Sequence, residues 1–220
     1  MAELSLRDRA KAKTRKPSSE PFIILFVCTG NVCRSPLAEQ LFAAKIAEVG
    51  LGELIIVHSA GTAALVGQGM PAQAAALSEG LGGHPEPHRA RLLTAEMVMD
   101  ADIVLALARE HRGSVAQLVP KAQARTFTLI EFARLLHAAS QEHRIASEPA
   151  LPEVPDFLRD LVERAALFRG VVGGPGEPEL DDVLDPYRRS QQSYDLSTQQ
   201  ITQAAKVIVA ALEQIVGPRR

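Results

Sequence analysis

The sequence predicts a three-layer α/β/α fold built around a central, mostly four-stranded parallel sheet. Short aliphatic runs without polar interruption are typical of strands that are buried on both faces. Segments with helical spacing of apolar residues alternate with these runs, and such alternation favours parallel strands joined by right-handed crossovers. A turn of small and polar residues follows the first run, where a phosphate-binding loop is expected. The four runs are FIILFVC (22–28), LIIVH (54–58), DIVLALA (102–108) and RTFTLI (125–130).

The segments between the runs predict the helices. After the first run, apolar residues from Ala38 to Val49 share one helical face, and Gly50 stands where a C-terminal cap is expected. Ser35 and Pro36 suit the cap and first turn of this helix. Further helices are predicted over 71–80, 110–118 and 191–216.

Two segments depart from this rhythm. Residues 139–182 are rich in proline, glycine and acidic side chains around one amphipathic stretch, PDFLRDLVERAALF, and we interpret them as a helix-containing insertion with flexible flanks. Residues 1–20 carry six Lys and Arg and predict a disordered basic tail instead of a signal peptide. Residues 21–220 are then expected to form one domain.

Composition narrows the classes of function. A formal net charge of −2 gives no electrostatic field that would favour nucleic acid. Two cysteines in 220 residues make no disulfide framework and fit a reducing compartment, so we expect a cytoplasmic protein. The apolar runs are far shorter than the roughly 20 residues that span a bilayer, so no membrane span is expected.

The stretch CTGNVCRS, residues 28–35, predicts an anion-binding cradle. A strand that turns into a helix directs several backbone N–H groups at one point. Gly30 and Asn31 tolerate the positive φ that a tight cradle requires. The planar guanidinium of Arg34 can grip two oxygens of a phosphate at once.

Cys28 begins this cradle, so its sulfur would face the same positive potential. A helix N-terminus and a nearby cation favour the thiolate, and a thiolate beneath a bound phosphate is a nucleophile aimed at phosphorus. Asp185, in LDPYRR, is the candidate that would protonate the leaving group and later take a proton from water. Pro186 would hold it in an extended loop.

The two cysteines also have other interpretations. Cys28 alone could be a buried core residue, and a metal site is disfavoured because Cys28 and Cys33 are not a C-x-x-C pair and the six histidines are scattered. Cys33 could pack the loop or form a reversible disulfide with Cys28. The histidines 58, 84, 111, 137 and 143 are expected at surface or satisfied positions.

These residues resemble the low-molecular-weight protein tyrosine phosphatase family. VCTGNVCRSP is similar to its signature, and DPY stands near the C-terminus. Between them, other stretches similar to the family follow in the family's order: HSAGT (58–62), HRARLL (88–93), ADIVLALAREH (101–111) and TLIEFARL (128–135). The resemblance implies Cys28 as nucleophile, Arg34 as phosphate clamp, Asp185 as general acid and Ser35 as hydroxyl donor to the thiolate. It implies that Ser59 and His88 hold Asn31. It places the loop residues Thr29, Gly30, Asn31, Val32, Cys33 and Ser35, with Leu65 and Tyr187 at the rim, against the substrate.

The expected function is phosphomonoester hydrolysis, most of all of phosphotyrosine, with no cofactor and no metal. Leu65 stands where many members carry an aromatic wall and Arg188 where a second aromatic is common, so Tyr187 is the main aromatic available to a substrate ring. The expected partner is a phosphorylated protein or a small phosphomonoester, and the chain is expected as a monomer or weak dimer. Two alternatives remain open: an arsenate reductase that uses a small-molecule thiol, and a phosphate-binding regulatory module without turnover.

Overall fold

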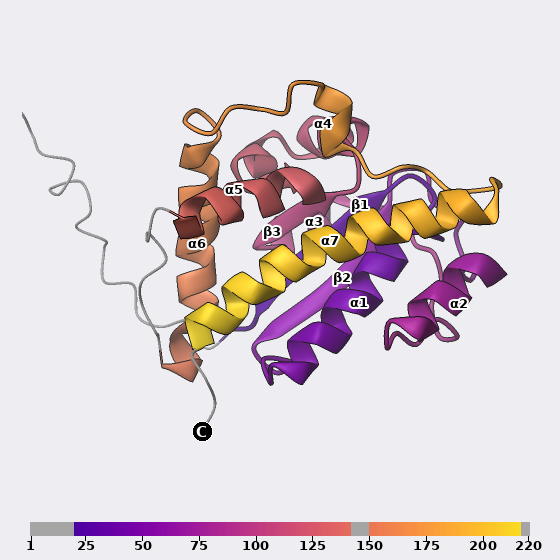
Figure 1. The fold of residues 1–220 in the computed structure, drawn as a ribbon, viewed down its shortest axis with the longest axis horizontal. Coiled ribbons are helices and arrows are strands. Elements are labelled where there is room, and N and C mark those ends of the chain that lie inside the picture. The colour runs from indigo at the N-terminus through magenta and orange to yellow at the C-terminus, as the bar shows by residue number, and fades with distance from the viewer. Residues whose placement is uncertain (1–19, 142–149, 217–220) are drawn as a thin grey trace, which may run out of the picture.

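A computed structural model describes residues 20–141 and 150–216, so the predicted basic tail and part of the predicted insertion lie outside the described residues. Its centre is a parallel sheet in the order β2-β1-β3-β4 (Figure 1). The strands are β1 (Phe22–Cys28), β2 (Ile55–Gly61), β3 (Ile103–Ala106) and β4 (Thr126–Thr128). Because all pairs are parallel, the carboxyl ends of the strands meet at one edge. Cys28 pairs with Gly61 at that edge.

Helices cover both faces of the sheet, which confirms the three-layer prediction. One face packs on α1 (Arg34–Glu48), α5 (Leu129–Gln141), α6 (Val154–Phe168) and α7 (Gln191–Val216), and alternate β1 residues such as Phe26 point into that core. The opposite β1 residues, such as Val27, pack towards α3 (Ala95–Asp100) and α4 (Arg109–Leu118). The alternation follows from the two-residue period of a strand. A short helix, α2 (Ala72–Gly80), lies beside α1 and α7 (Figure 1).

The predicted strand at 125–130 is too long, because β4 ends at Thr128 and α5 begins at Leu129. Thr128 and Glu131 form a reciprocal pair: the Glu131 amide donates to Thr128 Oγ1 at 3.1 Å, and the Thr128 amide donates to Glu131 Oε2 at 3.1 Å. This is a capping box, which starts a helix wherever Thr and Glu stand three residues apart before an apolar run. The apolar pattern of TLI hid that signal.

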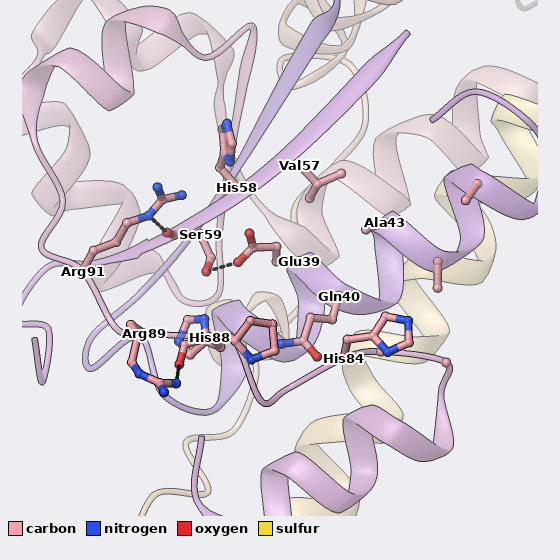
Figure 2. A pocket seen from close by; sticks show the side chains of 15 residues that line it. Glu39, Gln40, Ala43, Val57, His58, Ser59, His84, His88, Arg89 and Arg91 are labelled. Carbon is pink, nitrogen blue, oxygen red and sulfur yellow. Dashed lines mark hydrogen bonds between the residues drawn. The ribbon is translucent and has the colours of Figure 1, made fainter. Parts of the chain in front are cut away.

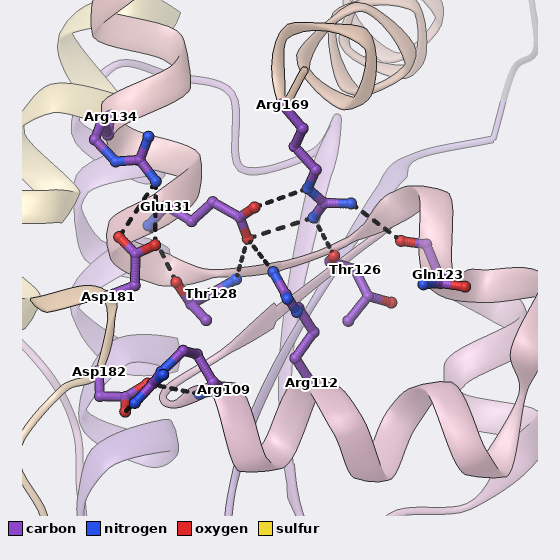
Figure 3. Close-up of polar contacts among 10 residues, drawn as sticks. All are labelled: Arg109, Arg112, Gln123, Thr126, Thr128, Glu131, Arg134, Arg169, Asp181 and Asp182. Carbon is purple, nitrogen blue, oxygen red and sulfur yellow. Dashed lines mark hydrogen bonds and ion pairs between the residues drawn. The ribbon is translucent and has the colours of Figure 1, made fainter. Parts of the chain in front are cut away.

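The C-terminal flank of the predicted insertion, which we expected to be flexible, is tied to the core by ion pairs (Figure 3). Arg169, just after α6, donates to Glu131 Oε1 at 2.8 Å and to the carbonyl oxygen of Thr126. Arg134 pairs with Asp181 at 3.1 Å. Arg109 pairs with Asp182 at 3.0 Å. These contacts fix the chain that leads to Asp185.

Among the described residues, no helix is both long and apolar enough to cross a bilayer.

Replacing Arg169 with alanine should lower the free energy of unfolding by about 2 kcal/mol, because Glu131 is 94% buried and would lose one of its two arginine partners. Burial alone would raise the pKa of Glu131, but the Arg169 hydrogen bond and charge, together with the Thr128 amide and the Arg112 charge, outweigh burial and lower that pKa. This stabilisation is therefore present above the ordinary carboxyl pKa and is lost as pH falls through the lower folded-state value. Urea unfolding at neutral and acidic pH measures it.

The control is Arg164→Ala, on an exposed position of the same helix, which should leave stability within about 0.5 kcal/mol. The difference in free energy of unfolding between wild type and Arg169→Ala should become smaller at acidic pH. A gap that stays constant down to low pH would contradict an origin in the Glu131 charge.

Candidate active site

The site lies at the carboxyl edge of the sheet, where residues 28–35 join β1 to α1. The carbonyl oxygen of Cys28 accepts from the Thr62 amide at 2.9 Å, so the end of β2 supports the start of the loop. Gly61 makes this close approach possible: a Cβ there would stand 2.4 Å from the carbonyl oxygen of Thr29. The loop is therefore held against its neighbouring strand.

The sulfur of Cys28 is held at the floor of the loop. Ser35 Oγ lies 2.9 Å from Cys28 Sγ, and the Asn31 amide donates to the same sulfur at 3.3 Å. Both contacts fix the position of the sulfur within the loop. Ser35 is not the helix cap that we expected, because Cys33 occupies the N-cap position and Ser35 lies in the first turn. From there its hydroxyl is directed at the sulfur instead of at the helix backbone.

Asn31 is the hub that fixes the cradle. It is fully buried at φ 53°, the left-handed region that an asparagine tolerates. Its side-chain amide donates to Ser35 Oγ at 2.9 Å and to Ser59 Oγ at 2.8 Å, and its Oδ1 accepts from the Arg91 amide at 2.9 Å. Its carbonyl oxygen accepts from His88 Nε2 at 2.7 Å. The structure thus brings Ser59 and His88 to Asn31, as the resemblance implied. Gly30, in contrast, does not adopt the positive φ that we predicted.

A cavity of about 660 Å³ lies behind this hub, between α1, β2 and residues 82–91 (Figure 2). Ser59 donates to Glu39 there, and Arg91 Nε donates to the Ser59 carbonyl oxygen at 2.8 Å. Burial raises the pKa of Glu39 despite the Ser59 hydrogen bond and the Arg91 charge. Burial also lowers the pKa of His88, so a neutral ring donates to Asn31. Glu39 lies in no sequence motif, and Arg91 lies in the HRARLL stretch without a role assigned to it, so the prediction missed both.

Arg34 and Asp185 meet at the mouth of the loop. Arg34 is 96% buried, and its Nη2 lies 3.1 Å from Asp185 Oδ2, whose side chain is 45% exposed. Arg34 also donates to the Val183 carbonyl oxygen at 3.3 Å and to Thr29 Oγ1 at 3.4 Å. The Tyr187 amide donates to Asp185 Oδ1 at 3.2 Å, which orients the carboxylate. The sequence could not establish that Asp185 reaches the cradle, and the structure brings it there.

His111 is a residue of the site that the sequence did not indicate. Of the two positions expected for it, surface or satisfied, the structure shows a buried one: His111 is 99% buried, and its Nε2 lies 2.9 Å from Thr29 Oγ1. Burial, together with the nearby Arg34 charge, lowers the pKa of His111 to about 4, so it is neutral at physiological pH. Its Nδ1 has no hydrogen-bond partner among the described residues. His111 thereby supports the second loop residue from outside the loop.

The rim of the loop is apolar. The Leu65 amide donates to the Gly30 carbonyl oxygen at 3.0 Å, and the side chains of Leu65 and Tyr187 pack against one cluster that contains Val32. The guanidinium of Arg188 lies 5.1 Å from the centre of the Tyr187 ring. Leu65 and Tyr187 are partly exposed, whereas Val32 is 97% buried and offers the loop's interior its backbone only.

Cys33 faces away from solvent and contacts Tyr194. Its sulfur lies 4.0 Å from the Tyr194 hydroxyl, and burial raises the pKa of this thiol to about 12. Both cysteines are free. A protonated thiol is a poor nucleophile, so the structure favours the packing role for Cys33 over the disulfide.

Comparison with known proteins agrees with this geometry. Residues 23–166 match the family described as low molecular weight phosphotyrosine protein phosphatase. The chain is 42% identical to low molecular weight protein-tyrosine phosphatase A of Mycobacterium tuberculosis, over 46% of this chain and 61% of that protein. It is 34% identical to a protein-arginine-phosphatase of Bacillus subtilis, over 65% of this chain and 93% of that protein.

A solved structure is similar as well. The low molecular weight protein tyrosine phosphatase from T. tengcongensis superposes with a TM-score of 0.60 at 27% identity, covering 86% of this chain and 98% of that chain. The chain therefore spans about three fifths of the mycobacterial relative and nearly the whole of the structural one.

Proposed function

We propose, since the chain belongs to the low molecular weight phosphotyrosine protein phosphatase family, that it hydrolyses phosphomonoesters through a phosphocysteine intermediate, with phosphotyrosine in proteins as the foremost substrate. The observation that carries this proposal is that one loop, residues 28–35, holds both Cys28 and Arg34, and that the distant Asp185 is brought to Arg34. Cys28 Sγ lies at the floor of the loop, Arg34 lies at its mouth, and the Asp185 carboxylate is 3.1 Å from the Arg34 guanidinium. These are a nucleophile, an anion clamp and a proton donor.

In the first step, the Cys28 thiolate attacks phosphorus while the bond between phosphorus and the ester oxygen breaks. Asp185 gives its proton to the departing oxygen, and the phosphoryl group stays on sulfur. Arg34 and the loop amides hold the three phosphoryl oxygens as their charge shifts. In the second step, water attacks phosphorus, Asp185 takes a proton from that water, and the bond between sulfur and phosphorus breaks to release phosphate.

Asp185 must carry a proton for the first step, although it pairs with Arg34 in the free protein. A bound phosphate dianion would take over the Arg34 guanidinium and place its negative charge beside the carboxylate. The Asp185 carboxyl is then released from its ion pair and can face the ester oxygen of the substrate. Substrate binding would thus prepare its own acid.

Phosphotyrosine is proposed because Leu65 and Tyr187 offer apolar and aromatic surface at the rim, where the ring of the substrate would stand. The chemistry needs Cys28 reduced, so we place the protein in a reducing compartment, the cytoplasm. We further propose that the protein acts as a monomer or a weak dimer.

The test compares four substrates with the purified protein. We expect p-nitrophenyl phosphate and a phosphotyrosine peptide to be hydrolysed, with a burst of released phenol if breakdown of the covalent intermediate is the slower step. A phosphoarginine peptide should react more slowly, and arsenate with glutathione should not be reduced. Arsenate reduction without ester hydrolysis, or phosphate binding without any turnover, would overturn the proposal. Preference for phosphoarginine would overturn the choice of phosphotyrosine.

A further inference from the structure

A second cavity adjoins the mouth of the loop formed by residues 28–35. It encloses about 650 Å³ and is walled by the start of α4, the chain from Glu179 to Asp185, and one face of α7. Arg34 and Asp185, which meet at the mouth of that loop, also line this cavity. A substrate whose phosphate lies on Arg34 therefore has this groove beside it, within reach of the neighbouring residues of the same chain.

The groove is acidic even after its ion pairs are formed. Arg109 donates to Asp182 at 3.0 Å and to Glu179 at 2.9 Å, so one guanidinium serves two carboxylates. Glu110 also lines the groove, and its carboxylate contacts only the His111 ring, at 3.3 Å, among the described residues. Because His111 is neutral at physiological pH, it does not neutralise Glu110. Three carboxylates and one guanidinium leave the groove negative.

The bound phosphate does not change this sign. Arg34 would then be balanced by the phosphate dianion, and Asp185 would be protonated for the first step. The charges of Glu110, Glu179 and Asp182 remain, and the first two of these side chains are each 72% exposed to the groove and solvent. The groove also offers apolar surface at Leu196, which is 45% exposed. A lysine or arginine side chain has the matching parts: a cationic head and an apolar stem.

We propose that the protein selects phosphorylated substrates that carry a lysine or arginine beside the phosphorylated residue, and that this groove binds the basic side chain. The inference rests on the proposed phosphatase function and names its substrate class. Attraction between charges near a protein surface acts over roughly 10 Å at 0.1 M salt, so the preference should be strong at low salt and weak at high salt.

The experiment uses two phosphotyrosine peptides of one sequence, with either lysine or glutamate at the positions that flank the phosphotyrosine. The ratio of their kcat/KM values is measured for wild type at low and high salt. We expect the lysine peptide to be favoured by about tenfold at low salt, which corresponds to about 1.4 kcal/mol, and by clearly less near 1 M salt.

Glu179→Lys should bring the ratio close to one, and Glu179→Gln should give an intermediate value. The matched control is Glu177→Lys, an exposed acid two residues earlier that makes the same change in net charge outside the groove. This control should shift the ratio clearly less than Glu179→Lys does, because its charge lies outside the groove. All variants should hydrolyse p-nitrophenyl phosphate at the wild-type rate, because that substrate has no flanking residue.

A wild-type ratio near one, or an equal shift in Glu177→Lys and Glu179→Lys, would overturn the groove assignment while p-nitrophenyl phosphate is still hydrolysed. If neither peptide nor p-nitrophenyl phosphate were hydrolysed, the proposed function itself would be wrong. The two failures are therefore distinct. Urea unfolding of each variant shows whether a loss comes from the fold.

Discussion

Replacing Cys28 with serine should abolish turnover and leave phosphate binding in place. A serine hydroxyl occupies nearly the same position but ionises far less readily than a thiol, so it attacks phosphorus poorly. The loss in kcat should be roughly 10⁴-fold or more, the scale of a lost covalent nucleophile. Phosphate affinity should persist, because Arg34 and the loop amides make the contacts with the oxygens. Steady-state hydrolysis and calorimetric titration with phosphate measure the two quantities.

The comparison variant is Cys33→Ser. Cys33 is buried against Tyr194, and its thiol has a pKa of about 12, so it offers no thiolate at neutral pH. Its replacement should lower kcat far less than the Cys28 change does. If Cys28→Ser kept measurable turnover while Cys33→Ser lost it, the two sulfurs would have exchanged roles and the assignment would be wrong.

The local features of the fold and the loop were predictable because they depend on neighbours in sequence. The strand FIILFVC ends at Cys28, as the aliphatic run predicted, and α7 spans 191–216, as the apolar stripe predicted. Asn31 takes the positive φ expected of its residue type. Thr128 and Glu131 show that a capping signal was also present three residues apart, although the apolar run concealed it.

The remaining features depend on chains that meet only after folding. Arg34 and Asp185 lie 3.1 Å apart, and two residues before Asp185 the Val183 amide donates to the Leu107 carbonyl oxygen at 2.8 Å, which no spacing encodes. His111 lies in the first turn of α4, at the end of the ADIVLALAREH stretch, which gave it no role, so only the structure shows that it contacts Thr29. Glu39, on α1, reaches the loop through Ser59, on β2, which in turn contacts Asn31. Sequence patterns identify groups that carry chemistry, while burial identifies the residues that position them.

Replacing Asp185 with asparagine should reduce hydrolysis of esters with poor leaving groups by roughly 10²- to 10³-fold, the usual share of a general acid. Asparagine keeps the shape of the side chain and cannot give up a proton of comparable acidity. The effect should be smaller for p-nitrophenyl phosphate, because p-nitrophenolate departs without being protonated. A plot of log kcat against leaving-group pKa should therefore be steeper for the variant than for wild type.

The same variant should bind phosphate more tightly, because the carboxylate no longer competes for the Arg34 guanidinium. Arg34 is buried, but the Asp185 side chain is 45% exposed and solvent screens the pair, so we expect the pair to amount to about 1 kcal/mol and the dissociation constant to fall by roughly a few-fold. The control is Asp195→Asn, at an exposed aspartate on α7 outside the active site. It should alter neither the rate on poor leaving groups nor the affinity for phosphate. Rates that stay at the wild-type level on poor leaving groups would show that another group supplies the proton, and unchanged phosphate affinity would show that the ion pair with Arg34 does not restrain the clamp.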